Sequence, residues 1–117
     1  MIRLLTNLFN ASKQPTQRVA GHDGETSMNF DSENVRPFLE GLADGTVDPS
    51  ALVTVDAALQ NMGVDETRDV VLNAQTGLQL QIYMDDIAAP DLYFFGSAEV
   101  IQYIDQALMA FATAMGL

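Results

Sequence analysis

The sequence of 117 residues predicts an α+β fold, in which a small antiparallel sheet packs against a long C-terminal helix. Three observations support this class. Residues 78–84 alternate apolar side chains with Gln or Tyr, as a strand with one buried face does. A glycine-containing turn and a second apolar run precede them, which is the pattern of a hairpin. Residues 98–115 repeat apolar side chains at helical spacing.

The full prediction is a hairpin of strands 69–75 and 78–85, a third strand at 92–95, and a helix over 98–115. Shorter helices are expected near 2–10, 35–44 and 49–62. A chain of this length has room for one hydrophobic core, so residues 1–117 are expected to form a single domain.

Charge is the unusual feature of the composition. The chain has 16 acidic and five basic residues, a net charge of -11. Residues 1–22 carry Arg3, Lys13 and Arg18 with no acid (+3), so the remaining 95 residues carry two arginines against all 16 carboxylates (-14). Such a body repels phosphate backbones and anionic lipid, which argues against nucleic-acid or membrane binding and favours a basic protein partner or simple solubility.

Targeting and redox signals are weak. The chain has no cysteine, which excludes disulfides and thiolate chemistry. The apolar run at 2–9 is short, is interrupted by Thr6 and Asn7, and lacks a following cleavage pattern. No stretch is long enough to span a bilayer. We therefore expect a cytoplasmic protein.

The first 30 residues contain one expected helix and one expected loop. Ile2, Leu5, Leu8 and Phe9 share a helical face, so residues 2–10 are predicted to form a short helix that packs on the body. A membrane anchor is the alternative role, which two turns of helix in front of an acidic body disfavour. Residues 11–27 are rich in Ser, Thr, Gln and Gly and are expected to be a mobile loop, and residues 28–30 a short strand.

Two helices are expected before the hairpin. Pro37 is tolerated only in the first turn of a helix, so a start near Asn34 and a helix over 35–44 are predicted. Asp48 and Pro49 form a second start signal, with Asp48 as the cap of a helix over 49–62. The β-branched run at 53–55 also fits a strand, but cap signals at both ends favour the helix.

The apolar pattern of the hairpin predicts its register. A two-residue turn at Thr76 and Gly77 would divide the apolar side chains between both faces. A three-residue loop, 75–77, pairs Leu72 with Leu80 and Val70 with Ile82, and places the apolar rows on one face. It also puts Gly77 where a left-handed residue is required.

The last helix is expected to supply most of the stability. Ser97 is its predicted cap, and Glu99 is favourably placed in its first turn. Its apolar stripe should lie against the sheet, and burial of five such side chains contributes roughly 8–15 kcal/mol before conformational entropy is subtracted. The stripe consists of Ile101, Ile104, Leu108, Phe111 and Met115.

The sequence offers no recognisable catalytic set, cofactor motif or metal motif. His22 is the only histidine and lies in a glycine-rich segment. General-base catalysis needs the ring held beside a nucleophile and oriented by a third group, and a mobile loop does not favour such an arrangement. Asp85, Asp86 and Asp91 cluster near the end of the central strand and have the oxygen ligands of a Mg²⁺ or Ca²⁺ site. Acidic residues also solvate turns, and we favour that reading. The protein is therefore expected not to be an enzyme.

The aromatic residues near the central strand allow two interpretations. Tyr83, Tyr93 and Phe95 are expected on the outer face of the sheet. They form either an exposed patch of the kind that interfaces bury, or a face covered by the helices at 35–44 and 49–62.

Taken together, charge and composition favour a binding protein that neutralises or shields a basic partner. The leading hypothesis is a bacterial immunity protein that inhibits a cognate toxin, as a monomer or homodimer. Two alternatives are a dimeric secretion chaperone for an effector and a DNA-mimic inhibitor. The expected partner-binding residues lie at one end of the sheet: Tyr83, Asp85, Asp86, Asp91 and Tyr93.

Overall fold

The structure is a computed structural model that describes residues 4–5 and 23–116. Five strands and three helices are described, and their bounds are as follows: β1 (Leu4–Leu5), β2 (Gly24–Asn29), α2 (Ser32–Glu40), α3 (Pro49–Asn61), β3 (Thr67–Asn73), β4 (Leu78–Tyr83), β5 (Asp91–Gly96) and α4 (Ala98–Ala114).

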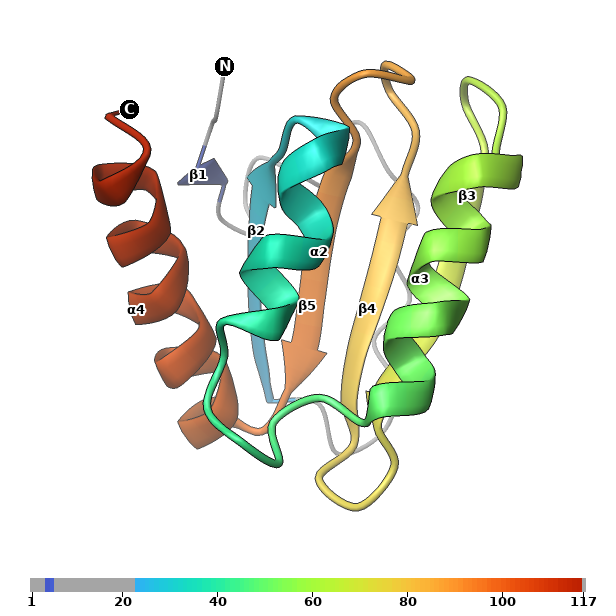
Figure 1. The fold of residues 1–117 in the computed structure, drawn as a ribbon. Coiled ribbons are helices and arrows are strands. Elements are labelled where there is room, and N and C mark those ends of the chain that lie inside the picture. The colour runs from blue at the N-terminus through green and yellow to red at the C-terminus, as the bar shows by residue number, and fades with distance from the viewer. Residues whose placement is uncertain (1–3, 6–22, 117) are drawn as a thin grey trace.

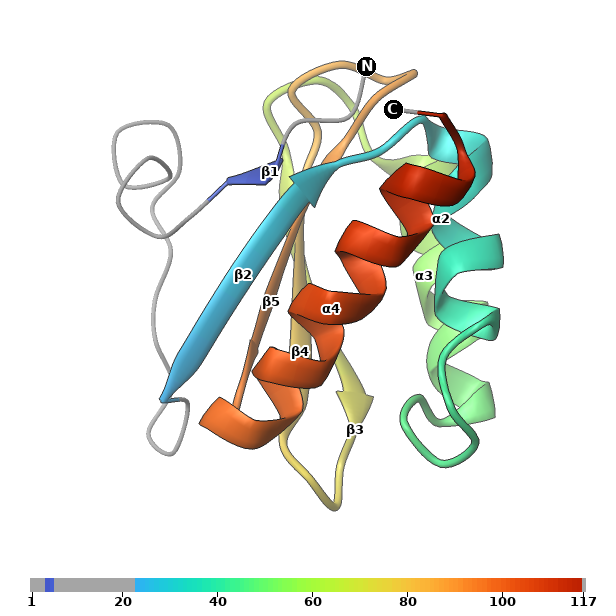
Figure 2. The same cartoon turned by 90° about the vertical axis from the view of Figure 1, so that its left-hand side faces the viewer.

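The strands form one antiparallel sheet in the order β1-β2-β5-β4-β3. All three helices lie on the same face of this sheet, with α4 over β2 and α3 over β3 (Figures 1 and 2). The predicted α+β class, with a sheet packed against a long C-terminal helix, is therefore confirmed. The strand expected at 92–95 is the central strand, β5, because β2 pairs along its other side.

The core lies between the sheet and the helices. Every second residue of β5 and β4 points toward the helices, and these side chains are almost completely buried. Phe30, at the end of β2, packs its ring 5.2 Å from that of Phe38, and Phe111 of α4 lies 5.5 Å from Phe38. The sheet side of this core includes Met28, Val70, Leu72, Leu78, Leu80, Ile82, Leu92 and Phe94.

The N-terminal third differs from the prediction. Residues 24–27, expected in a mobile loop, belong to β2, which pairs with β5 from Gly24 opposite Gly96 to Asn29 opposite Asp91. The expected helix over 2–10 is contradicted at residues 4–5, which form β1 and pair with β2. The rest of that helix and residues 11–22 lie outside the described residues. Strand β2 has no clear apolar alternation, so its conformation follows from pairing with β5.

Helix α2 begins earlier and ends earlier than the predicted range of 35–44. The amide of Ser32 donates to the Ala88 carbonyl at 2.8 Å, and its hydroxyl donates to the Ile87 carbonyl at 2.7 Å. These two bonds fix the start of the helix against the loop before β5, so Pro37 lies inside the helix and not in its first turn. Helix α2 therefore lacks one intrahelical hydrogen bond at Pro37, because proline has no amide hydrogen.

Helix α3 confirms the helical reading of residues 49–62, and Pro49 occupies its first position. The predicted role of Asp48 as a side-chain cap is wrong. Its carboxylate accepts the Ala74 amide at 3.3 Å, and its own amide donates to the Leu72 carbonyl at 2.7 Å. Asp48 therefore ties the start of α3 to the end of β3.

The hairpin has the predicted apolar face but a different register. Val70 opposes Leu80, not Ile82, and pairing is irregular between Val71 and Asn73. The reason is Asn73, whose side-chain oxygen accepts the amides of Gln75 and Thr76 and so builds a longer turn. Gly77 adopts the predicted left-handed conformation, with φ of 79°.

Helix α4 follows its prediction closely. The hydroxyl of Ser97 accepts the Val100 amide at 3.3 Å, and Ile101, Ile104 and Leu108 are buried. The stripe fades at its end, because Phe111 is half-buried and Met115 is 46% exposed.

Candidate protein-binding surface

Four exposed carboxylates meet at one end of the sheet. Asp65 and Glu66 lie on the loop between α3 and β3, and Asp85 and Asp86 lie on the loop between β4 and β5. Both loops are at the upper edge of Figure 1. We call these four residues the acidic end.

Backbone hydrogen bonds hold the two loops together. The Asp65 amide donates to the Met84 carbonyl at 2.8 Å, and the Met84 amide donates to the Glu66 carbonyl at 2.9 Å. Each loop is also braced internally: Glu66 Oε1 accepts the Gly63 amide at 2.8 Å, and Asp86 Oδ1 accepts the Ala88 amide at 2.9 Å. The carboxylates are therefore presented from a fixed backbone.

Tyr83 links the strand to this surface. Its hydroxyl donates to Asp65 Oδ1 at 2.9 Å. This hydrogen bond, together with desolvation and the nearby charges of Asp65, Asp85 and Asp91, raises the pKa of Tyr83 above its ordinary value. The phenol therefore stays neutral to a higher pH than an ordinary tyrosine does.

The start of α2 extends the acidic end. Ser32 is bonded to Ala88 and Ile87, so Asp31 and Glu33 are placed beside the loop that carries Asp86. An open hollow of about 340 Å³ lies here, lined by Asp31, Ser32, Glu33 and Ala88. A hollow next to several carboxylates has the chemistry to accept a long basic side chain.

Two of the five predicted binding residues do not lie on this surface. Asp91 and Tyr93 are both fully buried in β5. Asn29 donates to Asp91 Oδ1 at 2.8 Å, across the pairing of β2 with β5. The other three residues are placed together: Tyr83 is half-buried at the end of β4, and Asp85 and Asp86 are exposed directly after it.

The outer face of the sheet is not an open aromatic patch. Tyr93 and Phe95 point away from the helices, as expected, but are at most 1% exposed. The helices expected to cover them are on the opposite face (Figure 2). Neither of the two interpretations of this aromatic group is therefore correct.

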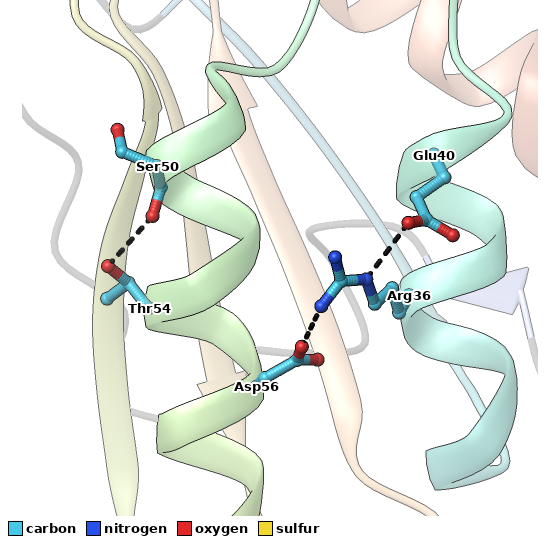
Figure 3. A network of polar contacts seen from close by, with 5 residues as sticks. All are labelled: Arg36, Glu40, Ser50, Thr54 and Asp56. Atoms are coloured by element: carbon cyan, nitrogen blue, oxygen red, sulfur yellow. Dashed lines mark hydrogen bonds and ion pairs between the residues drawn. The ribbon is translucent and has the colours of Figure 1, made fainter.

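On the helical face, charge is partly neutralised. Arg36 of α2 contacts Glu40 at 3.0 Å and also pairs with Asp56 of α3, so it bridges the two helices (Figure 3). The hydrogen bonds to Glu40 and Asp56 raise the pKa of Arg36. All three side chains are partly exposed, and such pairs contribute little to stability. Arg36, one of the two arginines after residue 22, is therefore already engaged in ion pairs.

Metal and membrane signals are absent from the described part of the chain. Within residues 4–5 and 23–116, no group of three or more His, Asp or Glu side chains is arranged to hold a metal ion. Asp85, Asp86 and Asp91 do not form one, since Asp91 is buried in β5. None of the helices in these ranges has both the length and the apolar character needed to cross a bilayer. His22 lies outside the described residues.

Comparisons with protein-family models, with curated proteins and with solved structures find no match to this chain.

Sequence reasoning missed Asp65 and Glu66. The signal was present, because antiparallel pairing of the predicted hairpin brings the residues before its first strand beside those after its second. Extending the predicted pairing outward by three residues, from 69 to 66, would have placed Glu66 opposite Asp86.

Proposed function

We propose that the chain is a non-enzymatic, cytoplasmic binding protein that neutralises a basic protein partner, and that it is a bacterial immunity protein acting on a cognate toxin. The observation that carries the proposal is the acidic end. Two loops fixed by hydrogen bonds present four exposed carboxylates together. A positively charged active-site surface, such as one that handles nucleic acid, is complementary to such a surface.

The surrounding features support the same role. A net charge of -14 after residue 22 accelerates encounter with a cation and disfavours anionic partners. Tyr83 supplies a neutral hydroxyl and an aromatic ring at the edge of the carboxylates, and the hollow at Asp31 and Glu33 accommodates a Lys or Arg side chain. Charge accounts for the speed of association, and these shaped features account for its specificity.

A secretion chaperone is a second candidate, because one edge of the sheet is open. Among the described strands β3 pairs with β4 alone, and four of its residues are exposed. An exposed edge is the surface on which a chaperone holds an extended effector segment. A homodimer in solution would favour this candidate over a monomeric immunity protein.

The test is affinity capture from the source cell at low ionic strength. We expect the wild-type chain to retain a basic protein, and Asp85→Lys with Asp86→Lys to lose it. Asp23→Lys with Asp44→Lys is the matched control, since it changes the net charge equally at the other end of the sheet. Asp23 adjoins Gly24, which pairs with the last residue of β5. Asp44 adjoins Gly45, whose carbonyl accepts a hydrogen bond from the Asn73 side chain at the hairpin turn.

A growth assay separates the two candidates. Expression of the captured protein alone arrests growth if it is a toxin, and co-expression of this chain restores growth. A captured protein that is harmless alone but is secreted only with this chain indicates a chaperone. Retention of nucleic acid as the sole partner would contradict both.

A further inference from the structure

Strand β3 forms an open edge of the sheet. It is hydrogen-bonded to β4 on one side, and no strand of the described chain lies beyond it. Thr67, Arg68, Asp69 and Val71 are exposed, whereas Val70 is buried under α3. An edge strand carries a row of backbone groups that lack a partner strand.

The pairing shows which backbone groups point outward. The Met84 amide donates to the Glu66 carbonyl, so this pair occupies a hydrogen-bonded position of the ladder. Such positions alternate in antiparallel pairs, so Arg68 and Val70 also bond to β4. The backbone N–H and C=O groups of Thr67, Asp69 and Val71 therefore face away from β4.

The edge closes at its far end. The Leu72 carbonyl accepts the Asp48 amide, and the Asn73 side chain is bonded to the Gly45 carbonyl at 2.7 Å. An added strand consequently has access to residues 67–71 only, which we call the open edge. It is continuous with the acidic end, because Asp65 and Glu66 immediately precede it.

We infer that the open edge binds an extended, basic segment of the partner, which adds a sixth strand beside β3. This inference rests on the proposed function, since the segment belongs to the same basic protein. Backbone hydrogen bonds to Thr67, Asp69 and Val71 hold the segment in place. Three exposed carboxylates, those of Asp65, Glu66 and Asp69, against the single guanidinium of Arg68, select a segment that carries Lys or Arg.

A second copy of this chain is a poor occupant. Two β3 strands related by a two-fold axis pair antiparallel, and their outward-facing residues must meet each other. One register over the open edge places Asp69 opposite Asp69 of the other copy, and the next places Arg68 opposite Arg68. Like charges directly opposite each other destabilise a strand pair. A third register, centred on Val70, avoids like charges but pairs only residues 69–71 of each copy.

The test uses a synthetic heptapeptide of alternating Lys and Val, added to the full ¹⁵N-labelled chain at low salt. At millimolar peptide we expect the amide resonances of Thr67, Asp69 and Val71 to shift and their hydrogen exchange to slow. A peptide of the same charge, methylated on the backbone nitrogens that face β3, should leave these amides unchanged. Because NMR detects millimolar binding, unchanged edge amides in the presence of the first peptide would overturn the inference.

Variants separate the edge from the acidic end. Thr67→Pro removes an outward N–H at the first position of a strand, where proline is tolerated, and should weaken binding of the peptide roughly three- to tenfold. Thr67→Val keeps the amide and is its control. Should Thr67→Pro fail to fold, Asp69→Lys keeps the backbone and should also weaken binding severalfold.

Two further outcomes would overturn the inference without touching the proposed function. In the first, the peptide shifts only the resonances of the acidic end, and Asp85→Lys with Asp86→Lys abolishes these shifts. In the second, the edge amides of the free protein become protected as its concentration rises, which would identify a second copy as the occupant. Loss of partner capture by wild-type chain would instead contradict the proposed function itself.

Discussion

The hydroxyl of Tyr83 donates a 2.9 Å hydrogen bond to Asp65, which joins the end of β4 to the loop before β3. Asp65 is the only non-glycine residue in the described ranges with a positive φ, 69°. A left-handed conformation is uncommon for a non-glycine residue, although aspartate adopts it more readily than most, and here the Tyr83 hydroxyl and the Met84 carbonyl both hold the residue in place. These hydrogen bonds therefore hold the backbone of the acidic end in a defined conformation.

Replacement of Asp65 by Asn should lower the pKa of Tyr83 toward its ordinary value. The wild-type pKa is raised because Asp65 accepts the phenol hydrogen, so neutral Tyr83 is favoured in the folded state. Its contribution to stability is complete below about pH 10, where an unfolded tyrosine ionises, and is lost as the pH rises through the folded pKa. An NMR titration of the tyrosine ring carbons measures this, and an unchanged Tyr83 midpoint would contradict the assignment.

Asn73→Ala should destabilise the fold by about 2–3 kcal/mol. The Asn73 side chain is 5% exposed, accepts the amides of Gln75 and Thr76, and donates to the Gly45 carbonyl, so its removal takes the side-chain partner from three backbone groups of the turn. Asn61→Ala is the control, since the Asn61 side chain donates to the Ala57 carbonyl on an exposed turn of α3. Equal denaturation midpoints for the two variants would refute this account of the turn.

Much of the fold follows from local patterns in the sequence. The hairpin and α4 have strong periodicity, glycine or cap signals at their ends, and buried faces that a register must respect. The start of α2 and the register of the hairpin were misjudged because both depend on a distant partner. Ser32 is fixed by the loop before β5, and Asn73 is fixed partly by Gly45. Single residues of this kind leave no periodic signal.

The site was predictable in part. The grouping of Tyr83, Asp85 and Asp86 at one end of the sheet was predictable because the alternation of β4 ends at them. Asp91 and Tyr93 were placed wrongly on the surface, because no pattern in residues 24–29 predicted that β2 pairs along β5, in which both residues are buried.

Gly24→Ala should destabilise the fold by about 1–3 kcal/mol. A Cβ atom at Gly24 would lie 2.9 Å from Cβ of Ile101, closer than real side chains approach, so α4 would have to shift from β2. Gly63→Ala is the matched control, because the nearest atom to its added Cβ is 3.9 Å away. Thermal unfolding of the two variants compares them directly, and an unaffected Gly24→Ala protein would contradict the close packing of α4 on β2.

Leu108→Ala should cost about 2–5 kcal/mol, because Leu108 is fully buried between α4 and the sheet. Met109→Ala, one residue further along the same helix, changes a side chain that is 51% exposed and should have little effect. Urea denaturation gives both values. If the two variants were equally stable, α4 would not be the stabilising element that its apolar stripe predicts.

The most direct test of the binding account is the association rate with the captured partner, measured by stopped flow over a range of ionic strengths. We predict that Asp85→Lys with Asp86→Lys leaves the fold intact and slows association at low salt by about tenfold or more, with a weaker dependence on salt. The control Asp23→Lys with Asp44→Lys should slow association much less. Equal rates for the wild-type chain and the Asp85→Lys, Asp86→Lys variant at low salt would show that the acidic end does not meet the partner.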